Sequence, residues 1–259
     1  MITFGPVRLT TDDHVATITL DDPDRHNRID DPLTDGLRDA VAAAVADPGV
    51  RVVVLAGSPR VFCSGHSRDW LLAADDDPGT RQGLVPAVDF IRAPIDCPLP
   101  VVAAMEGSAA GGGFLLGMYA DAAVLCERAV YSTIFMAYGF TPGMGSTVLL
   151  PRKLGHALGS ELLYTGRGYT GRELRSRGAP LRVVPKAEVV PTALALAHRI
   201  AQAPRRSLEA VKHQVSAELR AATSQAHRAE TQAQLETIAL PSVQARVRDM
   251  YPETSGPLS

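Results

Sequence analysis

The pattern of apolar and polar positions predicts strands in the first half of the chain. Residues 7–20 (VRLTTDDHVATITL) alternate apolar and polar side chains and are rich in β-branched residues, which predicts two short strands. RVVVLAG (51–57) and LPVVAAMEG (99–107) are apolar at consecutive positions, as in strands buried on both faces of a parallel sheet. FLLGMYADAAVLC (114–126) predicts a helix that leads to a third strand, and YSTIF (131–135) can continue the sheet.

Helical patterns lie between these strands and dominate the second half. Residues 31–46 carry Pro32 near the start and an alanine-rich apolar face, and 85–92 are also helical in pattern. Successive helical patterns then follow at 146–166, 170–178, 189–203 and 207–236. Strand and helix alternate first and helices gather later, which predicts an α/β core over 1–195 and a C-terminal helical region over 196–259.

Composition narrows the class of protein. The 259 residues carry a formal net charge of −2, which argues against nucleic acid as a partner. Apolar runs are broken well short of the ~20 residues needed to span a bilayer, and the N-terminus has no secretion-signal pattern. The three cysteines lack metal-ligand spacing, so we expect no metal site and a reduced, cytoplasmic setting.

Glycines mark two transitions from a strand through a loop to a helix. In 61-VFCSGHSRDWLL-72, Gly65 precedes His66, and 108-SAAGGGFLLGMYAD-121 contains three consecutive glycines. Glycine there permits unusual dihedral angles and close approach of a ligand to the main chain. Two such transitions after adjacent parallel strands can place two N–H donors on one oxygen, as in an oxyanion hole for an enolate. The alternative is a packing or turn role; a dinucleotide site is disfavoured because G-x-G-x-x-G spacing is lacking.

Four segments in this order make the chain similar to a known family. They are RVFCSGHSRDW (60–70), PVVAAMEGSAAGGGFLLGMYAD (100–121), YGFTPGMGST (138–147) and ELLYTGRGYTGRELRSRGAPLRVVP (161–185), and they resemble the enoyl-CoA hydratase/isomerase (crotonase) superfamily over about residues 5 to 220. The resemblance implies a spiral of ββα units, homotrimers or dimers of trimers, and an acyl-thioester substrate with no other cofactor.

The same resemblance assigns roles to the glycine transitions and shows that this sequence differs from the hydratases of the family at two positions. It implies that the N–H groups of His66 and Gly112 are the oxyanion-hole donors, with Gly111 beside the substrate. Hydratases of the family use two glutamates, and those positions are Leu115 and Phe135 here. Both acids of water addition are therefore replaced by hydrocarbon. Decarboxylation needs an enolate-stabilising hole and no general base, and so fits the residues that remain.

A narrower resemblance agrees with decarboxylation. YGFTPGMGST and SAAGGGFLLGMYADAAVL are similar to the decarboxylating enoyl-hydratase-like enzymes of polyketide β-branching. Those enzymes convert a 3-methylglutaconyl group on an acyl carrier protein to 3-methylcrotonyl or its isomer, using Lys, Tyr and His side chains. Here Trp70 stands at the tyrosine position and Ala74 at the lysine position.

Candidate side chains follow from this resemblance, each with a structural alternative. His213 is the expected proton donor by similarity to a C-terminal-helix histidine, and a helix-surface histidine is its alternative. The side chain of His66 either reaches the site or points to solvent. Arg68 or Arg81 can supply the positive charge of the missing lysine, or be solvated charges.

Other residues carry weaker expectations. Trp70 and Tyr138 either line the acyl pocket or belong to the core. The residues that could meet the phosphopantetheine phosphate are Arg205, Arg206 and Lys212. No role is assigned to the remaining histidines, which are His14, His26, His156, His198 and His227.

Two rival functions remain open. A double-bond isomerase, hydratase or hydrolase of acyl-CoA would need a carboxylate, and Asp69 is the only nearby one. A non-catalytic scaffold of the same fold would turn over no thioester and would tolerate Gly112→Val, which we expect to block an oxyanion hole.

Overall fold

Each turn of the chain contributes strands to two different sheets. The computed structural model describes residues 1–73 and 87–250. The larger sheet contains, in spatial order, β1 (Ile2–Phe4), β2 (Val7–Asp12), β3 (Val15–Leu20), β4 (Val52–Ala56), β6 (Val101–Met105), β8 (Ala122–Cys126) and β11 (Arg182–Val184). The smaller sheet has the order β10 (Tyr169–Thr170), β9 (Val130–Ser132), β7 (Ser108–Ala110) and β5 (Val61–Cys63).

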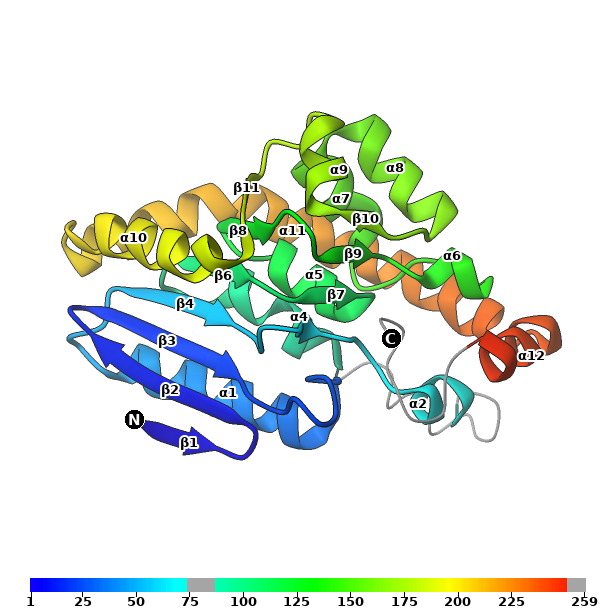
Figure 1. The fold of residues 1–259 in the computed structure, drawn as a ribbon, viewed down its shortest axis with the longest axis horizontal. Coiled ribbons are helices and arrows are strands. Elements are labelled where there is room, and N and C mark those ends of the chain that lie inside the picture. The colour runs from blue at the N-terminus through cyan, green and yellow to red at the C-terminus, as the bar shows by residue number, and fades with distance from the viewer. Residues whose placement is uncertain (74–86, 251–259) are drawn as a thin grey trace.

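The strand order explains the spiral. β4, β6 and β8 pair in parallel in the larger sheet, and β5, β7 and β9, which follow them in the chain, pair in parallel in the smaller one. Successive turns therefore stack with one strand in each sheet (Figure 1). This arrangement confirms the predicted α/β class and the crotonase-like spiral of ββα units with a helical C-terminal region.

The helices cover the sheets and extend beyond them. Their bounds are α1 Asp31–Ala46, α2 Arg68–Ala73, α4 Ala87–Asp96, α5 Gly112–Met118, α6 Phe135–Tyr138, α7 Ser146–Leu154, α8 His156–Thr165, α9 Gly171–Ser176, the 3-10 helix η1 Lys186–Glu188, α10 Val189–Ala201, α11 Arg205–Ile238 and α12 Pro241–Met250. α1 packs on β2 and β3, and α10 packs on β4, β6 and β8. α10 crosses residue 195, where the core was predicted to end, and the division into two regions stays a prediction.

The helical pattern at 146–166 is two helices. Gly155, with φ +87°, separates α7 from α8, because an angle in this region favours a residue without a Cβ. The short strands β5 and β7 were not predicted, since three residues are too few to display an alternating pattern.

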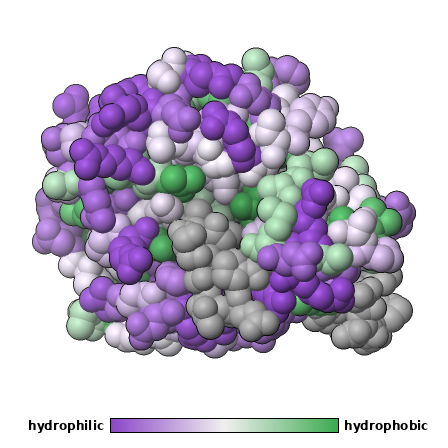
Figure 2. All heavy atoms as spheres, turned by 45° about the vertical axis from the view of Figure 1, so that its right-hand side comes forward, coloured by the Kyte–Doolittle hydropathy of each residue, from purple (hydrophilic) through white to green (hydrophobic). Residues whose placement is uncertain are grey.

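The longest helix, α11, reaches the end of the molecule at which α2, α6 and α12 lie. α11 has 34 residues, and Figure 1 shows it running from beside α10 to the end where α6, α12 and α2 lie. On the face drawn in Figure 2, hydrophilic residues cover most of the described surface, and hydrophobic residues are scattered among them, with the widest group right of the centre. Within the described residues, no helix is long and apolar enough to cross a bilayer.

Candidate active site

The two glycine transitions meet where β5 and β7 end. Gly65 has φ +82° and Gly111 has φ +51°, so both adopt backbone conformations that disfavour a side chain. A Cβ on Gly65 would lie 2.7 Å from the carbonyl oxygen of Ala110 and 3.7 Å from the nitrogen of Gly112. The two transitions are therefore in direct contact, as the sequence predicted for adjacent parallel strands.

Each of the three consecutive glycines at 111–113 is a glycine for a different physical reason. Gly111 is the N-cap of α5 and needs its positive φ. Gly113 has no room for a Cβ, which would lie 2.2 Å from the carbonyl oxygen of Cys63. A Cβ on Gly112 would meet the Cδ1 atoms of Ile91 and Ile29 at 2.8 and 2.9 Å. Gly112→Val would thus press on the hydrophobic core first, so it is a poorer probe of the oxyanion hole than expected.

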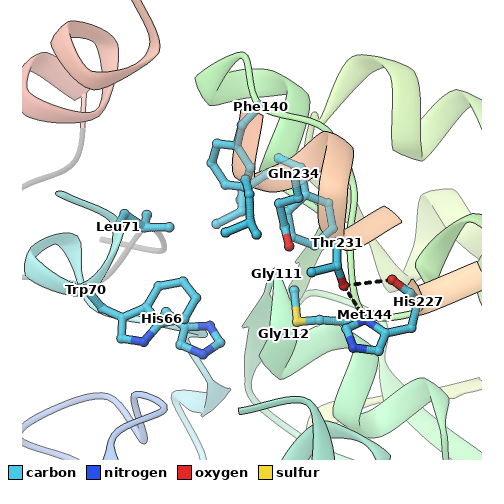
Figure 3. A pocket seen from close by; sticks show the side chains of 13 residues that line it. His66, Trp70, Leu71, Gly111, Gly112, Phe140, Met144, His227, Thr231 and Gln234 are labelled. Carbon is cyan, nitrogen blue, oxygen red and sulfur yellow. Dashed lines mark hydrogen bonds between the residues drawn. The ribbon is translucent and has the colours of Figure 1, made fainter. Parts of the chain in front are cut away.

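A pocket opens beside this junction, and its lining forms two walls. The glycine wall consists of His66, Trp70, Gly111 and Gly112, and the helix wall consists of His227, Thr231, Gln234 and Leu235 of α11. Figure 3 shows His66 and Trp70 on one side of the cavity, with His227 and Thr231 on the other. The remaining lining residues are Leu71, Ile134, Phe135, Phe140 and Met144.

The described lining has no aspartate, glutamate, lysine or arginine. His66 is buried, and burial lowers its pKa to about 3, so this imidazole is neutral near pH 7. Its ring stacks on that of Trp70 with centroids 3.8 Å apart. The chain's three lysines lie elsewhere: Lys153 donates to the carbonyl of Ala120, Lys212 pairs with Asp121, and Lys186 lies in η1.

Polar side chains of the helix wall form a connected group. The hydroxyl of Thr231 donates to the carbonyl oxygen of His227 at 2.8 Å, and its Oγ1 lies 3.3 Å from Nδ1 of the same residue. A hydroxyl has one proton, so Oγ1 is left to accept from Nδ1–H. This contact favours the tautomer in which Nε2 of His227 carries the lone pair, and it orients the ring.

Glu230, which follows His227 by about one helical turn, ties α11 to the loop before α7. The buried carboxylate of Glu230 accepts from the main-chain nitrogens of Gly145 at 2.6 Å and Thr147 at 2.9 Å, and from the Thr147 hydroxyl. The hydroxyl of Tyr119 donates to the carbonyl oxygen of Met144, which lies in the same loop and lines the pocket. These bonds fix the helix wall relative to Met144.

Five of the nine residues expected at the site line this pocket, and four do not. His66, Trp70, Gly111, Gly112 and Phe135 are present. Leu115 is fully buried in the core, and Tyr138 is buried with its pKa raised to about 12 by burial, but neither is among the lining residues. Arg68 donates to the carbonyl oxygen of Arg248 at 3.1 Å and does not line the pocket either.

The structure does not place His213 at the pocket. It is exposed on α11, fourteen residues before His227, or about 21 Å along the helix axis. His227, Thr231 and Gln234 were missed by sequence reasoning. The signal was a polar stripe along α11 with spacings of four, three, four and three residues, formed by Thr223, His227, Glu230, Gln234 and Thr237.

Two of the three residues considered for phosphate contact bond to other parts of the protein, and the third, Arg206, stays a prediction. Arg205 donates to the carbonyls of Val45, Asp47 and Val50 and pairs with Glu209, so it fastens the end of α1 to α11. Lys212 is buried and donates to Asp121 and to the carbonyl of Pro94. Arg206 is exposed. Ala74 and Arg81 lie outside the described residues.

No metal cluster replaces the missing charges in the described part of the chain. Those residues contain no group of three or more His, Cys, Asp or Glu side chains placed to hold a metal ion. Asp69, the carboxylate of the rival hypothesis, is exposed on α2 and is not a lining residue.

Comparison with known proteins places this arrangement in a family. The enoyl-CoA hydratase/isomerase family model matches residues 10–257. The bacillaene synthase decarboxylase PksI of Bacillus subtilis (strain 168) is 35% identical over 239 residues, covering 92% of this chain and 94% of that protein.

Solved structures agree. The ECH2 decarboxylase domain of CurF from Lyngbya majuscula superposes with a TM-score of 0.87 at 35% identity, covering 95% of this chain and 100% of that one. A chain from a dehydratase/decarboxylase enzyme couple involved in polyketide β-branching gives a TM-score of 0.88 at 34% identity, covering 95% and 99%. The predicted resemblance to decarboxylating enzymes of β-branching is confirmed, and the chain belongs to the enoyl-CoA hydratase/isomerase (crotonase) family.

Proposed function

We propose that this protein decarboxylates a 3-methylglutaconyl-type thioester, carried on an acyl carrier protein, in polyketide β-branching. One observation carries the proposal: the pocket joins two glycine-supported main-chain donors to a described lining without a carboxylate. Such a site can stabilise an enolate and has no described acid to position water. The likeness to PksI and to the CurF domain supports the same reaction.

The proposed reaction starts with the thioester carbonyl at the glycine wall. The bond between the terminal carboxylate and its neighbouring carbon breaks, and CO2 leaves. Its electron pair conjugates through the carbon–carbon double bond to the carbonyl, giving a dienolate. The N–H groups of His66 and Gly112 donate to the resulting oxyanion, which strengthens these bonds as charge develops.

We assign the protonation that ends the reaction to His227. It lies across the pocket from the glycine wall, and Thr231 holds its Nδ1 (Figure 3). In the imidazolium form, Nδ1–H stays bonded to Thr231 while Nε2–H passes its proton to a dienolate carbon, giving 3-methylcrotonyl or its isomer. The neutral ring, with its lone pair on Nε2, then takes a proton from solvent. The neutral His66, with a pKa near 3, is poorly suited to this step.

A substrate panel tests the reaction. We expect CO2 release from 3-methylglutaconyl-carrier protein and little water addition to crotonyl thioester. Hydration of the crotonyl thioester at ordinary enzymatic rates, with no CO2 from the carboxylated one, would contradict the proposal. A protein that turned over neither, beside an active control enzyme, would instead be a scaffold. The homotrimeric or hexameric assembly stays a prediction, which sedimentation of the same preparation would check.

A further inference from the structure

The carboxamide of Gln234 occupies a space that a glycine leaves open. A Cβ on Gly143 would lie 2.3 Å from Oε1 and 2.6 Å from Nε2 of Gln234. Gly143 is not among the glycines with positive φ, so its backbone conformation does not require glycine. The absence of a side chain at 143 therefore leaves room for the amide in this position.

This amide differs from its polar neighbours on the same face of α11. Glu230 accepts from Gly145 and Thr147, and Thr237 contacts Thr141 at 3.0 Å. Within the described part of the chain, the half-buried side chain of Gln234 makes no hydrogen bond. Water can satisfy a half-exposed amide, but a ligand that fills the pocket displaces this water and must offer a hydrogen-bond partner in its place. The amide of Gln234 is therefore available to a polar group of the ligand.

The chemistry of the lining indicates which part of the ligand this is. The Thr231 hydroxyl already donates to the carbonyl of His227, whereas the amide of Gln234 has two N–H donors to offer. The described lining contains no lysine or arginine. A substrate carboxylate that enters the pocket thus meets a neutral donor on the helix wall.

We infer that Gln234 binds the leaving carboxylate of the substrate through its amide N–H groups. This inference rests on the proposed decarboxylation and names a binding residue for it. A neutral amide orients the carboxylate but stabilises its charge less than a cation would. As CO2 departs, the negative charge moves from the carboxylate to the thioester oxygen, and no buried cation is left without its partner. Because the amide stabilises the bound carboxylate only weakly, the ground state of the substrate is less stabilised and the barrier to its decarboxylation is lower.

Two unreactive ligands separate carboxylate binding from general pocket shape. The pantetheine thioester of 3-methylglutarate keeps the carboxylate but lacks the conjugated double bond, so it cannot lose CO2 through a dienolate. The thioester of 3-methylbutyrate lacks the carboxylate. In Gln234→Leu we expect the dissociation constant of the first ligand to rise about 10- to 100-fold, the range for loss of a hydrogen bond to a charged group. The dissociation constant of the second ligand should change less than about twofold.

Matched variants complete the experiment. Gln232→Leu changes an exposed glutamine on the same helix, which donates to Glu236, and should leave both affinities unchanged. Gln234→Glu keeps the side-chain shape but adds a like charge, so it should weaken the carboxylated ligand further and spare the other. Equal losses for both ligands, or no loss for either, would overturn the inference. Absence of CO2 release by the wild-type enzyme would instead overturn the proposed function, and the binding comparison would remain readable.

Discussion

One wall of the pocket is made of main chain, and the opposite wall is made of side chains. The glycine wall depends on Gly65 and Gly111, whose positive φ angles set the backbone conformation just before His66 and Gly112. The helix wall depends on His227, Thr231 and Gln234, which project from one face of α11. In the proposed reaction, the spiral itself stabilises the enolate, whereas a helix far along the chain delivers the proton and binds the carboxylate.

Removing the imidazole from the helix wall should have the largest effect. His227→Ala deletes the proposed proton donor, and we expect turnover to fall about 10²- to 10⁴-fold, the usual contribution of general acid catalysis. His213→Ala, on the same helix but away from the pocket, should retain wild-type turnover. CO2 release and product formation, measured together, check this pair. Equal losses in both variants would remove the assignment to His227.

Crowding the glycine wall should have the next largest effect. In Gly65→Ala the new Cβ would lie 2.7 Å from the carbonyl oxygen of Ala110, so the His66 segment must move away from Gly112. We expect kcat to fall about 10²-fold, as when one oxyanion donor is lost.

Gly178→Ala is the matched control for this variant. Gly178 has a similar φ of +84°, but no atom lies within 4 Å of its Cβ position. It therefore tests backbone strain alone, and its kcat should stay at the wild-type value. A normal kcat in Gly65→Ala would show that the main-chain junction does not hold the reacting oxygen.

These pairs also show why one wall was predictable and the other was not. Gly65 and the glycines at 111–113 are visible in the sequence because an unusual backbone or a tight contact demands glycine. On α11 the helical pattern marks a face but not the turn that meets the pocket. The histidine expected at the site, His213, therefore lies about 21 Å along the helix axis from His227, the histidine that lines the pocket.

Short strands likewise limit how much of the fold can be predicted from the sequence. The long apolar runs of β4 and β6 were predicted correctly, whereas the three-residue strands β5 and β7 gain their identity only by pairing with each other. Phe135, which the family resemblance assigned to a glutamate position of the hydratases, does line the pocket.

The attachment of the helix wall should appear in stability. Glu230→Ala leaves the main-chain nitrogens of Gly145 and Thr147 without their acceptor, and we expect a loss of about 3 kcal/mol in unfolding free energy. Glu218→Ala, also on α11, removes an exposed carboxylate that pairs with Arg152 of α7, and it should lose less than about 1 kcal/mol. Urea unfolding measures both. Equal losses would show that Glu230 does not fasten the wall.

The smallest expected effect is the pH dependence of stability contributed by the glycine wall. The folded pKa of His66 is lowered to about 3, below the ordinary value near 6.5, so the unfolded chain binds the extra proton between these pH values. The contribution is present above pH 6.5 and is lost as pH falls, by about 2 kcal/mol at pH 5.

His66→Gln removes this titration. Its unfolding free energy should therefore fall less steeply between pH 6.5 and 5 than that of the wild type, with exposed His213→Gln as the control. Parallel pH profiles for His66→Gln and the wild type would contradict the lowered pKa.

The fate of 3-methylglutaconyl-carrier protein in D2O tests the central claim most directly. Mass spectrometry of the carrier-bound product distinguishes proton delivery to a dienolate from addition of water. We predict loss of one CO2, gain of one carbon-bound deuterium and no added oxygen. A product that keeps its carboxyl group and gains the elements of D2O would contradict the account, because it would require the acid–base pair that the described pocket lining lacks.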